Sequence, residues 1–268
     1  MIDFQCKSRY GWEDLLRVMA ILRAPGGCPW DAEQTHASIR RDLLEETWEV
    51  ADALDRDDPE AMCEELGDLL LQVVFHAQIE TEAGRFRIDD VVHGITQKMV
   101  YRHPHVFGGG MEADTSEEVL VNWEILKRKE KDQRSTADAI EAVPHTLPAL
   151  WRAEKVQKKT AKVGFDWSDR MDALRKLEEE VRELREALER GETDAPHGIR
   201  EEVGDTLFIA AKVAQMSGVD PEDALHRACD KFDQRFRLVE TAAAGKPLAE
   251  LTEEELIALW KAAKATES

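Results

Sequence analysis

The chain has 268 residues, of which 36 are Lys or Arg and 56 are Asp or Glu, so its formal net charge is -20. A surface this acidic repels nucleic acids and anionic membranes, and neither is expected as a partner. Apolar stretches are too short for a membrane span, the first ten residues lack the apolar core of a signal peptide, and four widely spaced cysteines are typical of free thiols. We therefore expect a soluble cytoplasmic protein.

Helix signals dominate the first half of the chain. Asp58 and Pro59 match an N-cap followed by proline at the first helical position, so a helix should begin there and end near Gly84. Residues 85–88 are expected to form at most a short extended piece, because no alternation of polar and apolar residues lasts long enough for a sheet. A capping box at residues 115–118 predicts the start of another helix.

The second half repeats these signals in the same order. Asp220 and Pro221 predict a helix that ends near Gly245, and a capping box at residues 252–255 precedes the last helix. Additional helices, expected at residues 12–23 and 147–162, lead into the two halves. The predicted fold class is therefore all-α, built as helical bundles.

Sequence motifs identify the two halves as copies of one unit. The motif E-L-G-D at residues 65–68 recurs as E-V-G-D at residues 202–205, and E-E-x-x-E at residues 45–49 recurs at residues 179–183. The offsets, 137 and 134 residues, are close to half the chain length, which indicates a tandem duplication. The predicted domains are residues 1–133 and 149–268, with a linker at residues 134–148.

Acidic residues in each copy have the spacing of a metal site. Residues three apart share one face of a helix, and in each copy two such pairs lie on successive helices. If the two helices pack side by side, four carboxylates converge, and an all-oxygen site favours Mg²⁺, with Mn²⁺ as a substitute. The eight predicted metal ligands are Glu46, Glu49, Glu65, Asp68, Glu180, Glu183, Glu202 and Asp205.

The alternative is that these carboxylates only cover solvated helix faces, as most acidic patterns do. Apolar neighbours such as Leu66 and Val203 argue against it, because buried acids need a partner. Gly67 and Gly204 lie in mid-helix, where glycine costs about 0.8–1.0 kcal/mol relative to alanine, which indicates close approach of another helix or a ligand. A di-iron bundle is disfavoured because its Glu-x-x-His motif occurs only at residues 33–36.

Cations and a tryptophan also recur in each copy. A Lys and an Arg four residues apart share a helical face and predict a phosphate clamp, with ordinary surface charges as the alternative. The tryptophan of each copy is suited to stack on a base or a sugar, with core packing as the alternative. The predicted binding residues are Lys98, Arg102, Trp123, Lys231, Arg235 and Trp260.

Three further motifs accompany this arrangement: G-G-C-P-W-D at residues 26–31, R-H-P-H-V-F at residues 102–107 and V-G-F-D-W at residues 163–167. With E-E-x-x-E and E-x-x-D in order, the chain resembles the MazG family of nucleoside triphosphate pyrophosphohydrolases over nearly its whole length. The resemblance implies an all-α homodimer whose bundles are completed across the interface. It also implies Mg²⁺-dependent hydrolysis of nucleoside triphosphates to monophosphate and pyrophosphate.

The resemblance further implies that the C-terminal copy performs catalysis. The catalytic residues carried over from the resemblance would be Glu180, Glu183, Glu202 and Asp205. Glu179 or one of these ligand carboxylates is expected to take the proton from water. Lys176, one turn before Glu180, would hold phosphates together with the cation pair of that copy. The aligned residue of the first copy is Asp42, so substrate binding is expected to be weaker there.

Three functions stay open at this stage. The first is hydrolysis of ordinary nucleoside triphosphates by attack of water on the α-phosphorus. The second is a narrower pyrophosphatase for dUTP or a modified nucleotide. The third is a nucleotide-sensing protein without catalysis, against which the complete carboxylate sets argue.

Overall fold

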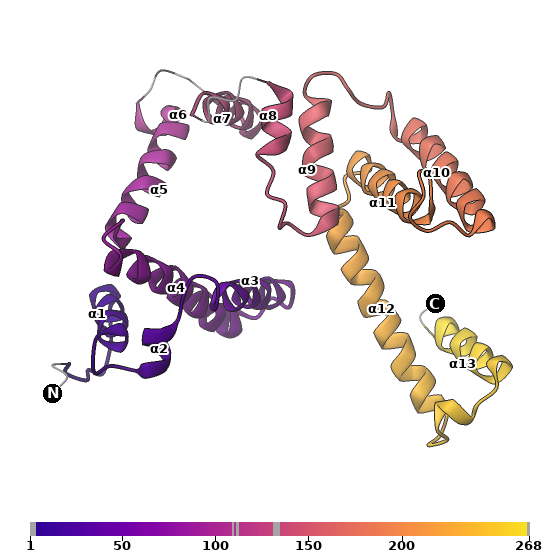
Figure 1. The fold of residues 1–268 in the computed structure, drawn as a ribbon, viewed down its shortest axis with the longest axis horizontal. Helices are drawn as coiled ribbons and strands as arrows, with labels where there is room; N and C mark the ends of the chain where they lie inside the picture. Colours follow the sequence, from indigo (N-terminus) through magenta and orange to yellow (C-terminus); the bar gives the residue numbers. More distant parts are fainter. Residues whose placement is uncertain (1–3, 109, 111–112, 131–134, 267–268) are drawn as a thin grey trace. The chain divides into compact units, whose positions relative to one another are not determined.

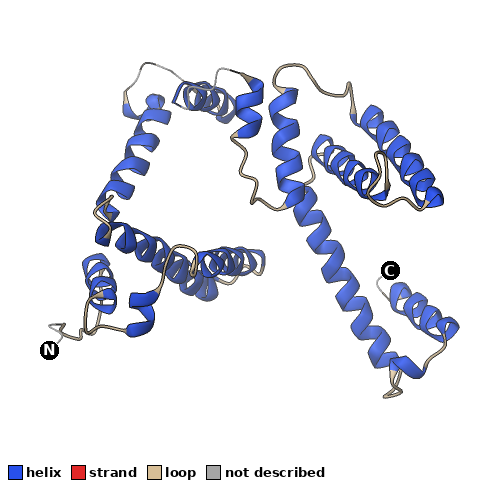
Figure 2. Ribbon diagram, viewed as in Figure 1, coloured by secondary structure: helices blue, strands red, loops and turns tan. Residues whose placement is uncertain are grey.

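The computed structural model describes residues 4–108, 110, 113–130 and 135–266, and all regular elements in those ranges are helical (Figures 1 and 2). The all-α prediction is therefore confirmed. Residues 85–88 do not form a strand: residues 85–87 lie in the connection between the helix that ends at Glu82 and the next helix, which begins at Ile88. No helix within the described ranges is long and apolar enough to cross a membrane.

The chain divides into two compact units, residues 1–130 and 131–268. The first unit contains α1 (Trp12–Arg23), α2 (Pro29–Glu33), α3 (Arg40–Asp55), α4 (Pro59–Glu82), α5 (Ile88–Arg102), α6 (Pro104–Phe107) and α7 (Ser116–Glu130). The second contains α8 (Thr136–Glu141), α9 (Ala149–Ala161), α10 (Arg170–Arg190), α11 (Ile199–Met216), α12 (Pro221–Ala242), η1 (Leu248–Glu250) and α13 (Glu253–Ala265). The range proposed as a linker thus contains α8, which packs against α9.

A pair of helices packed side by side forms the centre of each unit. In the first unit the pair is α3 and α4, and in the second it is α10 and α11 (Figure 1). These are the helices that carry E-E-x-x-E and E-x-x-D, so the pairing expected from the sequence is present in both copies. The following helices, α5 and α12, lead away from their pairs (Figure 1). Helix α12 packs mainly on α13, whereas α5 contacts α4, α6 and α7 to a similar extent.

The first unit has a small apolar core between α1 and α4. Met19, Ile39, Val74 and Phe75 are each at most 4% exposed. The guanidinium of Arg23 lies 5.2 Å from the centre of the Phe75 ring. Burial of four large side chains contributes roughly 1.5–3 kcal/mol each, so this cluster anchors α1 onto the α3–α4 pair.

The predicted helix starts at Asp58 and Asp220 are confirmed. Asp58 accepts hydrogen bonds from the backbone N–H groups of Glu60 and Ala61, and Asp220 caps α12 in the same way. Asp220 also accepts a hydrogen bond at 3.0 Å from the indole of Trp151 on α9. The second cap therefore joins two helices, whereas the first stabilises only one.

Loss of the two caps should have unequal effects on stability. We expect Asp58→Ala to lower the free energy of unfolding by about 1 kcal/mol, the usual effect of removing an N-cap. Asp220→Ala should have a larger effect, because the indole N–H of Trp151 also loses its acceptor. Thermal unfolding followed by circular dichroism measures both, and equal shifts in Tm would contradict the additional role of Asp220.

A chain of titratable side chains ties the segment before α3 to α4. The two Nδ1 atoms of His36 and His76 are 2.8 Å apart, and the Nε2 atom of His36 lies 2.5 Å from a carboxylate oxygen of Glu80. Glu80 also accepts two hydrogen bonds from Arg85, which lower its pKa to about 2. The Nε2 atom of His76 is buried and has no partner among the described residues.

When neither ring carries a charge, this arrangement fits one combination of tautomers. If Nε2–H of His36 donates to Glu80, its Nδ1 accepts from Nδ1–H of His76, and Nε2 of His76 carries no proton. A second proton on His76 would place an N–H group in a buried position without an acceptor. Burial, and secondarily the neighbouring His36, lower the pKa of His76 below its usual value of 6.5.

Acidification should consequently destabilise the first unit through His76. Between pH 6.5 and the lowered pKa of the folded state, the unfolded chain binds a proton that the folded chain does not, so stability falls as the pH falls. Thermal unfolding between pH 7.5 and 5.5 measures this slope. His76→Gln, which keeps a donor but cannot titrate, should lose less stability over that range than the wild type, and identical slopes would contradict the assignment.

Candidate metal centre

Three carboxylates converge in each copy. In the first unit they are Glu46 and Glu49 of α3 and Glu65 of α4, and one oxygen of each lies within 4.8 Å of the others. In the second unit, Glu180 and Glu183 of α10 converge in the same way with Glu202 of α11. Six of the eight predicted ligands are therefore brought together by the two helix pairs.

The remaining two predicted ligands, Asp68 and Asp205, lie at the border of these clusters. The negative charge of Asp68 contributes, after burial, to a raised pKa of Glu46. The pKa of Asp205 is itself raised, mainly by burial and then by the charge of Glu180. Mutual repulsion of this kind indicates that a bound cation would stabilise each group of acids.

The two clusters differ in their exposure to solvent. Glu180 and Glu202 are 5% and 3% exposed, whereas Glu46 and Glu65 are half-buried. In the second unit burial is also the main reason why the pKa of Glu183 is raised. The residues of both clusters offer only oxygen ligands and so fit a hard divalent cation. In the second cluster the buried carboxylates also need compensation, whereas in the first cluster Glu49 is exposed.

A lysine lies within the second cluster. The ammonium group of Lys176 is 2.8 Å from Glu179 and 2.9 Å from Glu180, and these hydrogen bonds raise the pKa of Lys176. Glu179 is absent from the group of three converging carboxylates and is instead held by Lys176, which lowers its pKa. Lys176, which was predicted to bind phosphate, is thus hydrogen-bonded to two carboxylates in this structure.

The predicted cation pair of the first unit is not brought to the carboxylates within the unit. Arg102 is 8% exposed and donates two hydrogen bonds to Glu130 at 2.9 and 2.7 Å, and its guanidinium lies 5.9 Å from the centre of the Trp123 ring. Lys98 lines a pocket between α5 and α7. Both lie in the part of α5 that points away from α3 and α4 (Figure 1).

Comparison with known proteins decides the family. The model of the MazG nucleotide pyrophosphohydrolase domain matches residues 34–107 and 170–239, which together are more than half of the chain. The chain belongs to the MazG family. The two matched segments contain both carboxylate clusters and both cation pairs, so the tandem duplication and the resemblance predicted from the sequence are confirmed.

Similar proteins match this MazG chain over nearly its whole length. A protein of Thermotoga maritima named nucleoside triphosphate pyrophosphohydrolase/pyrophosphatase MazG is 41% identical, covering 94% of this chain and 95% of its own. The nucleoside triphosphate pyrophosphohydrolase of Escherichia coli K12 is 43% identical, with coverage of 94% and 97%. That of Mycobacterium tuberculosis is 34% identical, with coverage of 93% and 68%. These matches confirm the expectation of an enzyme of this class.

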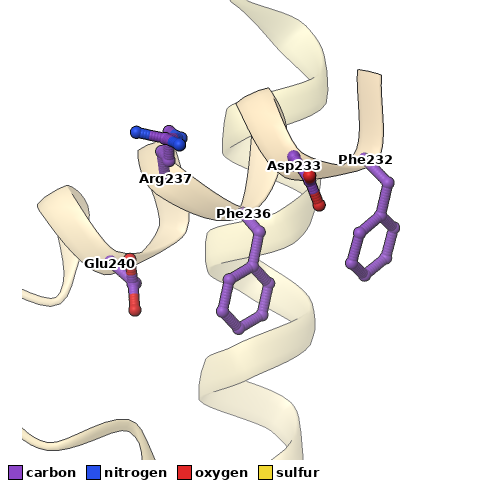
Figure 3. Close-up of a pocket in the computed structure, with 5 residues that line it drawn as sticks. All are labelled: Phe232, Asp233, Phe236, Arg237 and Glu240. Carbon is purple, nitrogen blue, oxygen red and sulfur yellow. The ribbon is translucent and has the colours of Figure 1, made fainter. Parts of the chain in front are cut away.

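An aromatic cluster in the second MazG domain was missed by the sequence reasoning. The Trp260 ring of α13 lies 5.0 Å from that of Phe232, and Phe232 stacks on Phe236 at 6.0 Å. Both phenyl rings project from one side of α12 and line a pocket (Figure 3). The spacing of four residues, each next to a residue of the Lys231–Arg235 pair, was the signal that could have predicted this cluster.

The mid-helix glycines were expected to allow close approach of another helix or a ligand, and the first alternative is wrong for the described helices of this chain, whereas approach of a ligand stays a prediction. A Cβ atom built on Gly67 or Gly204 would meet nothing within 4 Å in the described structure. The absence of a side chain therefore leaves open space beside each cluster instead of accommodating a neighbouring helix. The helices α4 and α11 continue through these positions without interruption.

Proposed function

We propose that the second MazG domain hydrolyses nucleoside triphosphates to nucleoside monophosphates and pyrophosphate by Mg²⁺-dependent attack of water on the α-phosphorus. The observation that supports this most is the buried cluster of Glu180, Glu183 and Glu202, with Lys176 hydrogen-bonded to it. Full-length relatives whose names state this activity support it independently.

The carboxylates of the second domain would hold the cation, with Asp205 completing the set from the border of the cluster. When bound, a divalent cation supplies positive charge that offsets the negative charge of the triphosphate. The side chains on α10 and α11 keep the carboxylates in position before substrate arrives, which reduces the reorganisation needed during reaction.

The cationic side chains would act on the leaving group. Lys231 and Arg235 on α12 are suited to stabilise the departing pyrophosphate electrostatically, together with Lys176. Proton removal from water requires an ionised carboxylate. Glu179, whose pKa is lowered by Lys176, and the cluster carboxylates are the two alternatives for this role.

We further propose that the functional form is a homodimer. Within one chain, α12 carries Lys231 and Arg235 away from the carboxylate pair of helices, so a second copy would supply the missing side of the site. Apolar residues on α5 and α12 also lie at the surface, between 38% and 54% exposed: Val91, Val92, Ile95, Met99, Leu225, Phe232, Phe236 and Leu238. Light scattering should give twice the chain mass of 30.4 kDa, and a fully active monomer would contradict this proposal.

Product analysis tests the reaction. The metal-free protein is incubated with a panel of NTPs and dNTPs with and without Mg²⁺, and products are separated by anion exchange. Monophosphate and pyrophosphate formed only with Mg²⁺ are expected. Diphosphate and orthophosphate would contradict attack at the α-phosphorus, and tight nucleotide binding without any product would favour the nucleotide-sensing alternative.

The same panel separates a broad enzyme from one specific for dUTP or a modified nucleotide. The cluster of Phe232, Phe236 and Trp260 favours the broad enzyme, because aromatic rings stack on every base with little discrimination. Rates within about tenfold of one another across the bases are expected. A single strongly preferred base would support the narrow alternative instead.

A further inference from the structure

The residue one helical turn before each carboxylate cluster carries the opposite charge in the two domains. In the second domain Lys176 precedes Glu180 by four residues, and its ammonium group lies 2.9 Å from a Glu180 oxygen. In the first domain the aligned residue is Asp42, which precedes Glu46 by the same four residues and is half-buried. One cluster therefore contains its own cation, whereas the other has an additional acid at that position.

The charges around the first cluster are mostly negative, with Arg56 acting on Glu65 as the weakest of the contributions to its pKa. The charges that act most strongly on Glu46 are those of Asp68, Glu49 and Glu65. In the second domain, by contrast, Lys176 acts as an opposite charge on both Glu183 and Asp205. The first cluster thus has more unbalanced negative charge when no metal is bound.

We propose that Lys176 is a built-in counter-ion that competes with the divalent cation for Glu180, so that without nucleotide the first MazG domain is the tighter metal site. The proposal rests on the proposed function of both clusters as metal sites. The ammonium group and a metal ion cannot both occupy the same face of the Glu180 carboxylate at contact distance. Lys176 occupies one oxygen of Glu180, Oε1, so a cation that binds this oxygen displaces Lys176, whereas the first domain has no such competitor at position 42.

Displacement of Lys176 would link metal binding to nucleotide binding. Once released from Glu180, the ammonium group can pair with a triphosphate, so a nucleotide makes the displacement more favourable. Because such coupling is reciprocal, the metal in turn increases the affinity for the nucleotide. The second domain would therefore bind cation and substrate together, whereas the first domain would retain a cation in the absence of substrate.

Manganese binding to the full-length, metal-free protein without nucleotide tests the proposal. Titration followed by electron paramagnetic resonance of free Mn²⁺ should resolve a tighter and a weaker class of site. Glu46→Gln with Glu49→Gln should remove the tighter class, and Glu180→Gln with Glu183→Gln the weaker one. The opposite assignment, or no binding to either cluster at millimolar Mn²⁺, would overturn the proposal.

Two charge exchanges then test the role of the counter-ion. Lys176→Met should tighten Mn²⁺ binding in the second domain by about tenfold or more, and Asp42→Lys should weaken binding in the first domain by a similar factor. Arg175→Met is the control for Lys176→Met, because it removes the same charge from a side chain that pairs with Asp172. Asp55→Lys is the control for Asp42→Lys, because it makes the same charge change at an exposed residue at the end of α3. Equal shifts in variants and controls, or no shift in Lys176→Met, would overturn the proposal.

The Mn²⁺-binding experiments and the product analysis can fail independently of each other. Product formation by the wild-type protein together with unchanged Mn²⁺ affinity in Lys176→Met would overturn the counter-ion role and leave hydrolysis standing. The predicted affinity shifts without product formation by the wild type would support the counter-ion role and contradict hydrolysis. Circular dichroism of each variant checks that helix content is retained.

Discussion

Replacement of Glu180 by glutamine should reduce the rate of nucleoside triphosphate hydrolysis by about 10³-fold. Glu180 is 5% exposed and lies at the centre of the second cluster, where it meets Glu183, Glu202 and Lys176. The amide has nearly the same shape but no charge, so the site would lose electrostatic stabilisation equivalent to about 4 kcal/mol. Initial rates of pyrophosphate release measure the effect, with circular dichroism as the check on folding.

The matched variant in the first domain is Glu46→Gln. If catalysis resides in the second domain, this variant should keep most of the activity, because Glu46 is the residue of the first domain that aligns with Glu180. Loss of activity in Glu46→Gln with retention in Glu180→Gln would move catalysis to the first domain. Wild-type rates in both Glu180→Ala and Asp205→Ala would contradict the site assignment altogether.

Helix boundaries and the carboxylate clusters could be predicted because their signals are local. The N-cap at Asp58 and the proline that follows define the start of α4 within a few residues of chain, independently of tertiary contacts. The spacing of three residues then decides which acids share a helical face. The repeat indicated that each copy carries two such helices in succession. Side-by-side packing of the two helices then brings three carboxylates together in each copy, six in all.

The position of the cation pairs could not be predicted in this way. Lys98 and Arg102 share a face of α5, as expected, but the direction of α5 depends on the turn after α4 and on packing against α7. The ion pair of buried Arg102 with the more exposed Glu130 joins residues 28 apart, for which no local pattern exists. The same applies to the Phe232–Trp260 contact, which depends on the return of α13 onto α12.

A buried lysine in the second domain shows how one position of the repeat has diverged. Lys212 is 1% exposed, and its ammonium group lies 2.5 Å from Asp166 and 3.0 Å from the side-chain oxygen of Gln215. The aligned residue in the first domain is Phe75, which is 4% exposed in the apolar core. An ion pair thus occupies the place of a phenyl ring, and it ties the segment before α10 to α11.

We expect Asp166→Ala to destabilise the second domain by about 3–5 kcal/mol, because it removes the carboxylate that pairs with the buried ammonium of Lys212 and leaves the weaker contacts with the Gln215 amide oxygen and the Trp167 ring. For a unit of this size the calorimetric Tm should fall by about 10 °C. Lys212→Met in the same chain should restore much of the loss, since the first domain shows that this position accepts an apolar side chain. If the double variant is no more stable than Asp166→Ala alone, the unpaired charge is not the cause, and the contribution of Asp166 must come from the geometry of its loop.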